Sequence, residues 1–437
     1  MHLTGTMNVN NKGHLEIGGV DAVYLAEEFG TPLWVLDEQG FRQNCRNFKN
    51  AFSEYGDSLV IYASKSLCTL SVCRMVDEED LGLDIVSGGE LFTSLKAGFP
   101  AEKIYFHGNN KSSDELKMAL EAGVGRIVVD NFYELRLLDR ICSECNKVQD
   151  ILLRITPGVE AHTHEYIKTG QVDSKFGFSL LKGQAIEGIK DAITSKNLSL
   201  VGLHCHIGSQ IFEMDSFRYA AAVMMDFVGE AKKITGYEFD ELNLGGGFGI
   251  YYYYGDEPRE PREWAETVML TVQEKSRELG LRVPKVIVEP GRAISGPAGI
   301  TLYTIGSIKE IPGIRKYIAV DGGMTDNPRP ALYGAKYKAM IANKADRSPQ
   351  ETVSVAGKCC ESGDMLIWDA YLPQVETGDI LAVFATGAYN YSMASNYNRL
   401  LKPAMVVVNE GKADIIVRRE NYEDLIRNDI ILDRLKK

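Results

Sequence analysis

The sequence has little of what marks several classes of protein. Basic residues are few, since 48 lysines and arginines stand against 60 acidic residues and give a net charge of -12. A nucleic-acid-binding surface needs a basic excess, so we expect no nucleic-acid partner. No apolar run comes near the roughly 18 residues that suggest a membrane span. The N-terminus lacks a basic cluster followed by an apolar stretch, and we expect a cytoplasmic protein with no membrane contact.

Disulfide spacing is also lacking, because the eight cysteines are scattered along the chain. This distribution agrees with a reducing compartment. Cys142 and Cys145 have the spacing of a redox or zinc motif, but no second pair completes a metal site. We interpret them as ordinary helix residues.

A repeating unit is present between about residues 35 and 292. Short apolar runs alternate there with amphipathic stretches, and the runs are Leu59–Ala63, Leu83–Val86, Lys103–Phe106, Arg126–Val129, Ile151–Ile155, Leu200–Cys205, Glu241–Leu244 and Lys285–Val288. Alternating strands and helices predict a parallel sheet, and eight such units predict a closed (β/α)8 barrel. An open doubly wound sheet is the alternative, but no Gly-rich dinucleotide turn follows the first run.

The sequence pattern changes after Arg292. Turn residues separate short runs rich in Val, Ile and Tyr, namely Ile300–Ile305, Tyr317–Val320, Thr352–Val355, Ile380–Ala385, Met405–Val408 and Ala413–Arg418. This pattern predicts a mainly antiparallel β domain, a barrel or a sandwich. His14–Gly19 and Pro32–Leu36 also look like strands and could join it. We therefore predict a barrel domain over residues 35–292 and a β domain from residues 1–34 and 293–437.

Reactive side chains gather after the predicted strands, where barrel enzymes carry their catalytic groups. Lys65 follows the first run, and partial desolvation there would lower its pKa and free the amine for Schiff-base chemistry. The turn Gly245–Gly247 lets backbone N–H groups approach an anion, although a plain tight turn would explain it equally well. Glu289 could keep a pyridinium nitrogen protonated. The alternative for Glu289 is an ion pair with Arg292.

Two histidine pairs have a spacing that could serve a metal. His204 and His206 lie two apart on a strand and share a face, as do His162 and His164 in their own segment. A metal site needs three or four converging ligands, and no convincing set can be assembled. We expect no metal, and an imidazole stacked on a cofactor ring is an equally good use for one of them.

Several motifs occur together in a family-specific order. They are Tyr-Ala-Ser-Lys (62–65), Asp-Ile-Val-Ser-Gly-Gly-Glu (84–90), Phe-His-Gly-Asn-Asn-Lys (106–111), His-Thr-His-Glu-Tyr-Ile-Lys-Thr-Gly (162–170), Ser-Lys-Phe-Gly-Phe (174–178), His-Ile-Gly-Ser-Gln (206–210), Gly-Gly-Gly-Phe-Gly (245–249), Glu-Pro-Gly-Arg (289–292), Arg-Pro-Ala-Leu-Tyr (329–333), Cys-Glu-Ser-Gly-Asp (360–364) and Gly-Ala-Tyr (387–389). With them the chain resembles the diaminopimelate decarboxylases, within the pyridoxal phosphate (PLP)-dependent ornithine, arginine and diaminopimelate decarboxylases. The resemblance runs from about Thr31 to Glu420.

The resemblance implies a cofactor, a substrate and a role for each site residue. Lys65 would carry PLP, His206 would stack on its ring, Asp84 would lie near the lysine and Glu289 would pair with the ring nitrogen. The phosphate would be held by Ser209, Gly247, the Gly291–Arg292 turn and Tyr389. The far end of an amino-acid substrate would be bound by Arg292, Arg329, Tyr333, Tyr389 and Glu361. Cys360 would be the proton donor after carbon dioxide leaves, and Cys360 and Glu361 would reach the partner's site in a homodimer.

The expected reaction is the decarboxylation of meso-2,6-diaminopimelate to L-lysine. Arginine suits the far carboxylate of that substrate, because a guanidinium can bind a carboxylate bidentately. Lysine and ornithine lack this carboxylate and would leave a buried arginine unpaired, which strongly disfavours them as substrates. Related decarboxylases for ornithine, lysine or carboxynorspermidine are the first alternative. A catalytically dead binding homologue would have lost Lys65, and a racemase on the same barrel would leave Cys360 and Glu361 without a role.

Overall fold

A computed structural model of the chain describes residues 3–158 and 173–436. Contacts divide the chain into two compact units. Unit 1 comprises Met1–Phe41, Tyr252–Tyr254 and Gly296–Lys437, and unit 2 comprises Arg42–Tyr251 and Gly255–Ser295. The domain boundaries expected from the sequence, at residues 35 and 292, stay predictions. His162, His164 and the motif around them (162–170) lie outside the described residues.

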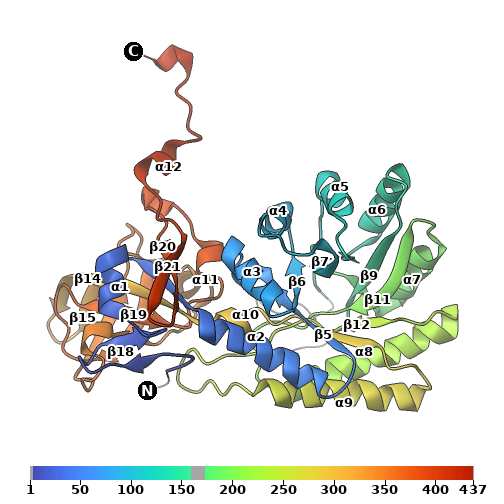
Figure 1. Cartoon of the computed structure of the whole chain (residues 1–437), viewed down its shortest axis with the longest axis horizontal. Coiled ribbons are helices and arrows are strands. Elements are labelled where there is room, and N and C mark those ends of the chain that lie inside the picture. The colour runs from blue at the N-terminus through green and yellow to red at the C-terminus, as the bar shows by residue number, and fades with distance from the viewer. Residues whose placement is uncertain (1–2, 159–172, 437) are drawn as a thin grey trace. The chain divides into compact units, whose positions relative to one another are not determined.

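Unit 2 is a closed barrel of parallel strands, as predicted (Figure 1). Within the described residues the eight barrel strands are β5 (Ser58–Ala63), β6 (Gly82–Ile85), β7 (Ile104–Phe106), β8 (Arg126–Val129), β9 (Gln149–Thr156), β11 (Leu198–His204), β12 (Glu241–Asn243) and β13 (Lys285–Val288). The pairing of β13 with β5 and of β8 with β9 completes the ring. A short strand, β10 (Phe178–Ser179), adds to β9.

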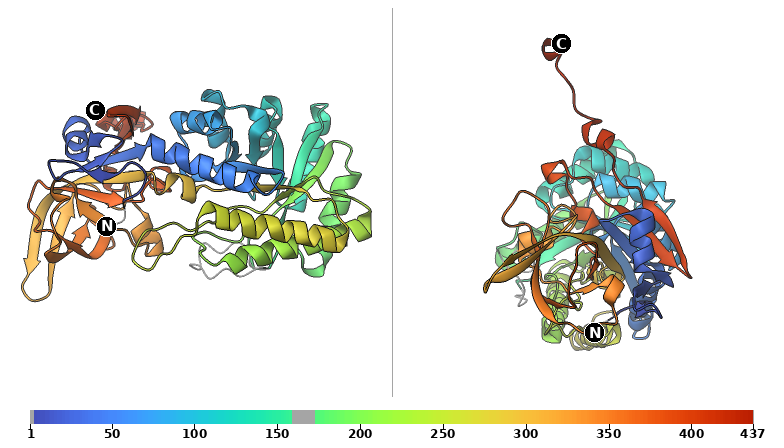
Figure 2. Two further views of the ribbon diagram at one scale, coloured as in Figure 1. Left: turned by 60° about the horizontal axis from the view of Figure 1, so that its bottom comes forward. Right: turned by 90° about the vertical axis from the view of Figure 1, so that its left-hand side faces the viewer.

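Helices separate the strands of the barrel. They are α2 (Glu38–Ser53), which begins at the end of unit 1, α3 (Leu70–Glu78), α4 (Gly88–Lys96), α5 (Ser113–Ala122), α6 (Phe132–Glu144), α7 (Gln184–Thr194), α8 (Met214–Thr235), α9 (Pro261–Leu279) and α10 (Arg292–Ser295). Helices α8 and α9 lie side by side in both views (Figures 1 and 2).

Local capping explains where two of these helices begin and end. A capping box of Ser112 and Glu115 starts α5, and Gly123 ends it in the left-handed conformation. Helix α9 has a capping box of Glu260 and Glu263 and ends at the left-handed Gly280. In each case a side chain satisfies exposed N–H groups at the start, and glycine accepts the backbone turn at the end.

The interior of the barrel is filled by apolar side chains from several strands. Ile61, Tyr105, Val128, Leu152 and Ile287 form one buried cluster inside it. Such layers make the barrel a packed core, so that functional groups can be exposed only at its ends. The groups of interest come from the C-terminal ends of the strands.

Unit 1 contains a mainly antiparallel sheet, also as predicted. In the order given by pairing, its main path runs β18 (Met365–Leu372), β17 (Glu351–Ala356), β15 (Arg315–Val320), β14 (Gly299–Ile311), β4 (Leu33–Asp37), β20 (Ala404–Asn409) and β21 (Lys412–Val417). Off this path, β19 (Ile380–Phe384) pairs with β14, and β16 (Ala339–Ile341) pairs with β19. Strand β4 pairs with β14 and β20, so the segment Pro32–Leu36 does join the C-terminal strands.

The segment His14–Gly19 behaves differently from Pro32–Leu36. It supplies β2 (Leu15–Ile17), which pairs with β1 (Asn8–Val9) and β3 (Val20–Asp21) in a separate small sheet of unit 1. Its side chains Leu15 and Ile17 pack with α1 (Ala22–Phe29) into the same core as β4 and β14. The short helices α11 (Arg329–Tyr333) and α12 (Tyr422–Ile426) also belong to this unit.

Two further expectations concern the whole chain. All eight cysteines are free thiols, and Cys142 and Cys145 lie in α6 and at its C-terminal cap. Among the described residues, no helix is both long and apolar enough to span a membrane.

Candidate active site

Lys65 lies in a short turn of 3-10 helix, Ser64–Ser66, immediately after β5. It is half-buried. The Ser66 hydroxyl donates to the Ala63 carbonyl at 2.8 Å and closes this turn. A Cβ atom on Gly291 would lie 2.9 Å from Ala63, which shows how closely the chain after β13 packs against it. The ends of β5 and β13 therefore hold the lysine in a defined place at the mouth of the barrel.

Glu289, directly after β13, is buried, and three polar side chains lie against its carboxylate. Asn243 donates to its Oε1 at 2.7 Å, and Nε2 of His107 lies 3.0 Å from the same oxygen. Nε2 of His204 lies 3.4 Å from Oε2. Burial by itself would raise the pKa of Glu289, but the two imidazoles outweigh it and hold the pKa well below its ordinary value. Glu289 is thus a buried carboxylate that stays ionised.

Asp84, in β6, is buried beside Glu289, but its pKa is shifted in the opposite direction. Burial, with the negative charge of Glu289 adding to it, raises the pKa of Asp84 to about 7. His107 Nε2 is 3.7 Å from Asp84 Oδ1, and within the described chain that oxygen has no hydrogen-bond partner. Two neighbouring carboxyl groups with pKa values pushed apart are typical of catalytic sites.

His206 and the turn Gly245–Gly247 form the next part of the mouth. The Gly246 N–H donates to Nδ1 of His206 at 3.2 Å and so fixes the imidazole. Burial, followed by the positive charges of Lys65 and Arg154, lowers the pKa of His206 well below its ordinary value. A neutral, oriented imidazole is suited to lie flat against a ring.

The glycine turn allows no side chain at its centre. A Cβ on Gly246 would lie 2.2 Å from the Glu289 carbonyl oxygen, and one on Gly247 would lie 2.5 Å from that of Gly208. Gly247 also has a φ of +110°, which other residues rarely adopt. The turn is therefore a bare backbone surface next to Glu289 and His206, and backbone N–H groups in such turns bind anions.

Ser209 and Arg292 meet at the same end of the barrel. Nη2 of Arg292 donates to Ser209 Oγ at 2.9 Å. Arg292 is buried and belongs to α10, directly after Gly291. A guanidinium and a hydroxyl held together in this way offer donors to a phosphate or a carboxylate.

These residues fit pyridoxal phosphate. The glycine turn packs too closely on the neighbouring backbone for any Cβ and so presents backbone alone, Glu289 supplies a negative charge, and His206 supplies a neutral ring. In contrast, Lys111, in the motif at 106–111, has a structural role, because it forms a buried ion pair with Glu134 at 2.7 Å.

A second cluster, within unit 1, surrounds Arg329 at the start of α11. Its guanidinium carbon lies 5.5 Å from the ring centres of Tyr252 and Tyr389 and 5.8 Å from that of Tyr333. Arg329 is 8% exposed, and its Nε has no hydrogen-bond partner among the described residues. A buried cation held by aromatic faces is open to an anion.

Cys360 and Glu361 are exposed on a loop of unit 1. The loop is organised by the buried Asp364, whose carboxylate accepts from the N–H groups of Cys359 and Met324 at 2.8 Å and 2.7 Å. The Cys360 N–H donates to Asn398 at 2.7 Å. The backbone of this loop is thus fixed, while the two side chains of interest face outward.

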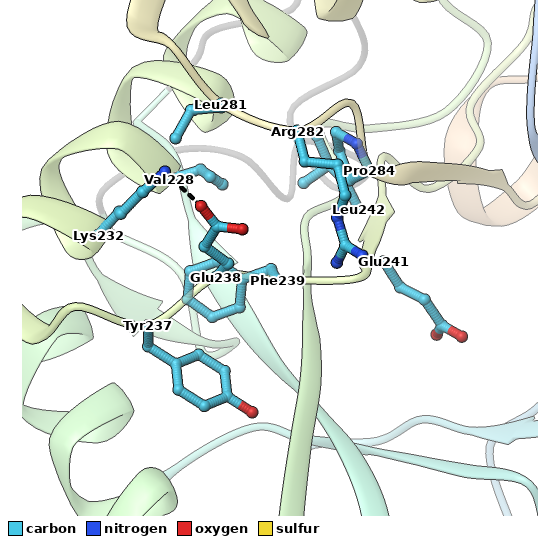
Figure 3. A pocket seen from close by; sticks show the side chains of 10 residues that line it. All are labelled: Val228, Lys232, Tyr237, Glu238, Phe239, Glu241, Leu242, Leu281, Arg282 and Pro284. Carbon is cyan, nitrogen blue, oxygen red and sulfur yellow. Dashed lines mark ion pairs between the residues drawn. The ribbon is translucent and has the colours of Figure 1, made fainter.

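Two hollows have linings that include none of the predicted site residues. One, between α8, the N-terminal end of β12 and the segment that follows α9, is lined by Val228, Phe239 and Leu242 and by the ion pair of Lys232 with Glu238 (Figure 3). Its volume of about 10 Å³ has room for a water at most. The other, about 320 Å³, lies within unit 1 around Tyr254 and Lys338.

The structure brings together the barrel residues predicted from the sequence, and separately Arg329, Tyr333 and Tyr389. It also adds three side chains that the sequence analysis did not assign to the site: His107, Asn243 and Tyr252. His107 and Asn243 each follow or end a barrel strand, which is the available signal in the sequence. Tyr252 lies in a run of tyrosines that looks like an ordinary loop, and no pattern marks it.

The fold and the barrel mouth together define a class, that of (β/α)8 enzymes with a phosphorylated organic cofactor bound at the C-terminal ends of the strands. The family described as "Pyridoxal-dependent decarboxylase, pyridoxal binding domain" matches residues 38–296. The chain belongs to this family of pyridoxal-dependent decarboxylases. The family and the pyridoxal cofactor expected from the sequence are confirmed.

Known relatives match over almost the full length. The diaminopimelate decarboxylase of Bacillus subtilis (strain 168) is 54% identical over 98% of both chains. That of Staphylococcus aureus (strain COL) is 45% identical over 97% of this chain and 99% of the relative. The crystal structure of diaminopimelate decarboxylase from M. jannaschii in complex with L-lysine has a TM-score of 0.93 at 36% identity and covers 100% of both chains.

Proposed function

We propose that this chain decarboxylates meso-diaminopimelate to L-lysine and carbon dioxide with pyridoxal phosphate as cofactor. The observation that supports this substrate is Arg329, a buried guanidinium whose Nε has no hydrogen-bond partner among the described residues. The relatives that match the whole chain carry the name of this activity.

The barrel mouth would hold the cofactor. Lys65 would bind it covalently, with Asp84 beside the lysine, and His206 would lie against the ring. Ser209, Gly247, Gly291 with Arg292, and Tyr389 would hold the phosphate, and Glu289 would keep the ring nitrogen protonated. When bound, pyridoxal phosphate accepts the electron pair that the departing carboxylate leaves at the α-carbon.

The far end of the substrate carries an ammonium and a carboxylate, and the chain offers a group for each. Arg329, with Arg292, Tyr333 and Tyr389, would bind the carboxylate, and Glu361 would bind the ammonium. Ornithine and lysine lack that carboxylate and would leave Arg329 buried and unpaired, so they should be poor substrates.

The bond from the α-carbon to the reacting carboxylate breaks, carbon dioxide leaves, and the α-carbon takes a proton. Cys360 would donate this proton from its thiol. Cys360 and Glu361 are exposed in one copy of the chain, and we propose that they complete the site of a second copy in a homodimer. We also place the protein in the cytoplasm, where its free cysteines stay reduced.

The role of Lys65 can be tested by chemical trapping. Borohydride reduction of the holoenzyme followed by peptide mapping should place the pyridoxyl group on Lys65. The variant Lys65→Ala should lose the trapped group and the production of lysine, whereas Lys190→Ala, on the exposed face of α7, should retain both. Retention of colour and of lysine production in Lys65→Ala would refute the proposal, as would a wild-type protein that makes no lysine from meso-diaminopimelate.

The shared site can be tested by mixing variants. Lys65→Ala and Cys360→Ala are each expected to be inactive. After they are unfolded and refolded together, mixed dimers should contain one intact site, and part of the activity should return. No recovery, with mixed dimers demonstrated by mass spectrometry, would show that each chain builds its own complete site.

A further inference from the structure

More polar side chains lie around the Glu289 carboxylate than it would need if its only role were to pair with a ring nitrogen. A carboxylate has about four lone-pair positions for hydrogen bonds. Asn243 and His107 lie at Oε1, at 2.7 Å and 3.0 Å, and His204 lies at Oε2 at 3.4 Å. Asn243 and His204 are the hydrogen-bond donors, while Nε2 of His107 lies close to Oε1 without hydrogen-bond geometry, so acceptor capacity remains on Oε2.

Asn243 and His204 are neutral groups that donate hydrogen bonds to Glu289 and do not act as acids toward it. Asn243 accepts from the Gly245 N–H through Oδ1 at 2.9 Å, so its amide nitrogen must be the atom that faces Glu289. Burial lowers the pKa of His204 to about 4, so the ring is neutral at physiological pH. Nδ1 of His204 has no hydrogen-bond partner in the part of the chain that the structure describes. With its proton on Nε2, His204 therefore donates to Glu289 alone.

The two imidazoles also support each other. Their ring centres are 4.8 Å apart and the rings are inclined by 69°. His107 and His204 are 4% and 1% exposed, so neither can turn toward solvent. They come from the ends of β7 and β11, which lie on different sides of the barrel mouth, and each approaches Glu289 from its own side.

We propose that His107 and His204 are positioning residues that, with Asn243, hold the Glu289 carboxylate in place so that Oε2 is directed at the ring nitrogen of the cofactor. This inference rests on the proposed function. Asn243 also connects Glu289 to the glycine turn, so the partner of the ring and the cradle of the phosphate are set by one side chain.

The same three groups suggest a competing use. His107, His204 and Glu289 each offer a ligand atom, and these atoms lie within 4.8 Å of one another, as in a metal site. A metal would occupy the acceptor position on Glu289 that a cofactor ring needs. The two uses exclude each other and can be distinguished.

The test uses holoenzyme prepared with cofactor labelled with ¹⁵N in the ring. The nitrogen chemical shift reports directly whether the ring nitrogen carries a proton. The wild type should show the protonated shift across the accessible pH range. His107→Leu and His204→Leu should move the shift toward the unprotonated value and lower kcat about 10- to 100-fold, the usual effect of a lost hydrogen bond to a charged group. KM for diaminopimelate should stay within about twofold.

Conservative and control variants separate positioning from folding. His204→Gln places an amide donor near the position of Nε2 and should restore the protonated shift. His14→Leu removes a comparable imidazole, one that contacts Asp21 at 2.9 Å in unit 1, and should leave the shift unchanged. If the leucine variants do not fold, Asn243→Asp, which replaces a donor with a repelling oxygen, gives the same readout.

An unchanged ¹⁵N shift in both folded leucine variants would overturn the inference. So would one equivalent of metal in the wild-type holoenzyme that is lost in either histidine variant. If the wild type binds the labelled cofactor but does not decarboxylate diaminopimelate, the proposed substrate fails, whereas the ring-nitrogen experiment still decides the role of the histidines.

Discussion

Replacing Arg329 with methionine should separate substrate binding from stability. Truncating one partner of a buried, hydrogen-bonded charge pair costs about 2 to 5 kcal/mol. Since each 1.4 kcal/mol is tenfold, a loss of about 3 to 4 kcal/mol lowers kcat/KM for diaminopimelate roughly 10²- to 10³-fold. Most of the change should appear in KM, because the interaction lies far from the bond that breaks.

The stability of the same variant should change little. The guanidinium interacts with three tyrosine rings at 5.5 to 5.8 Å, and each contact contributes about 0.5 to 2 kcal/mol. Against this stands the desolvation of a buried cation, which costs several kcal/mol. Methionine keeps favourable sulfur–aromatic contacts. The two terms offset each other, and the free energy of unfolding should move by less than about 2 kcal/mol.

Steady-state release of carbon dioxide and urea unfolding measure the two quantities. Arg347→Met, at an exposed position of unit 1, is the matched control and should change neither. Arg329→Lys keeps the charge without the bidentate geometry and should give an intermediate KM. A kcat/KM for Arg329→Met within threefold of the wild type would refute the reasoning. An unfolding loss of more than about 4 kcal/mol would show that the residue is structural.

Three further outcomes follow from the barrel. Gly246→Ala places a Cβ 2.2 Å from the Glu289 carbonyl oxygen, so equilibrium dialysis should show cofactor affinity reduced at least tenfold, and wild-type affinity would contradict the clash. Lys111→Met leaves the buried Glu134 unpaired and should cost about 3 to 5 kcal/mol in urea unfolding, with a smaller loss in the double variant Lys111→Met/Glu134→Leu. Asp84 has its pKa raised from 3.8 to about 7, so the folded cofactor-free protein binds more protons than the unfolded chain within that window. The contribution of Asp84 to stability is therefore lost as pH rises from about 4 to 7. Asp84→Asn should flatten the measured slope of unfolding free energy against pH in this range. An unchanged slope would refute the raised pKa.

The sequence by itself determined the architecture of both units. The eight barrel strands follow from short apolar runs between amphipathic stretches, and the bounds of α5 and α9 follow from capping residues next to them. These signals are local, so they need no knowledge of distant contacts. The same alternation placed Lys65, Asp84, His206 and Glu289 at strand ends, where parallel strands bring their side chains to one edge.

Only the tertiary structure decided what surrounds those side chains. Glu289 is joined to His107, His204 and Asn243, which are 182, 85 and 46 residues away in the chain, and no local pattern encodes such pairs. The aromatic setting of Arg329 likewise depends on Tyr252, which stands 77 residues before it. The physical reason is that pKa values and acceptor positions are set by burial and by neighbours in space, and these exist only once the strands have closed the barrel.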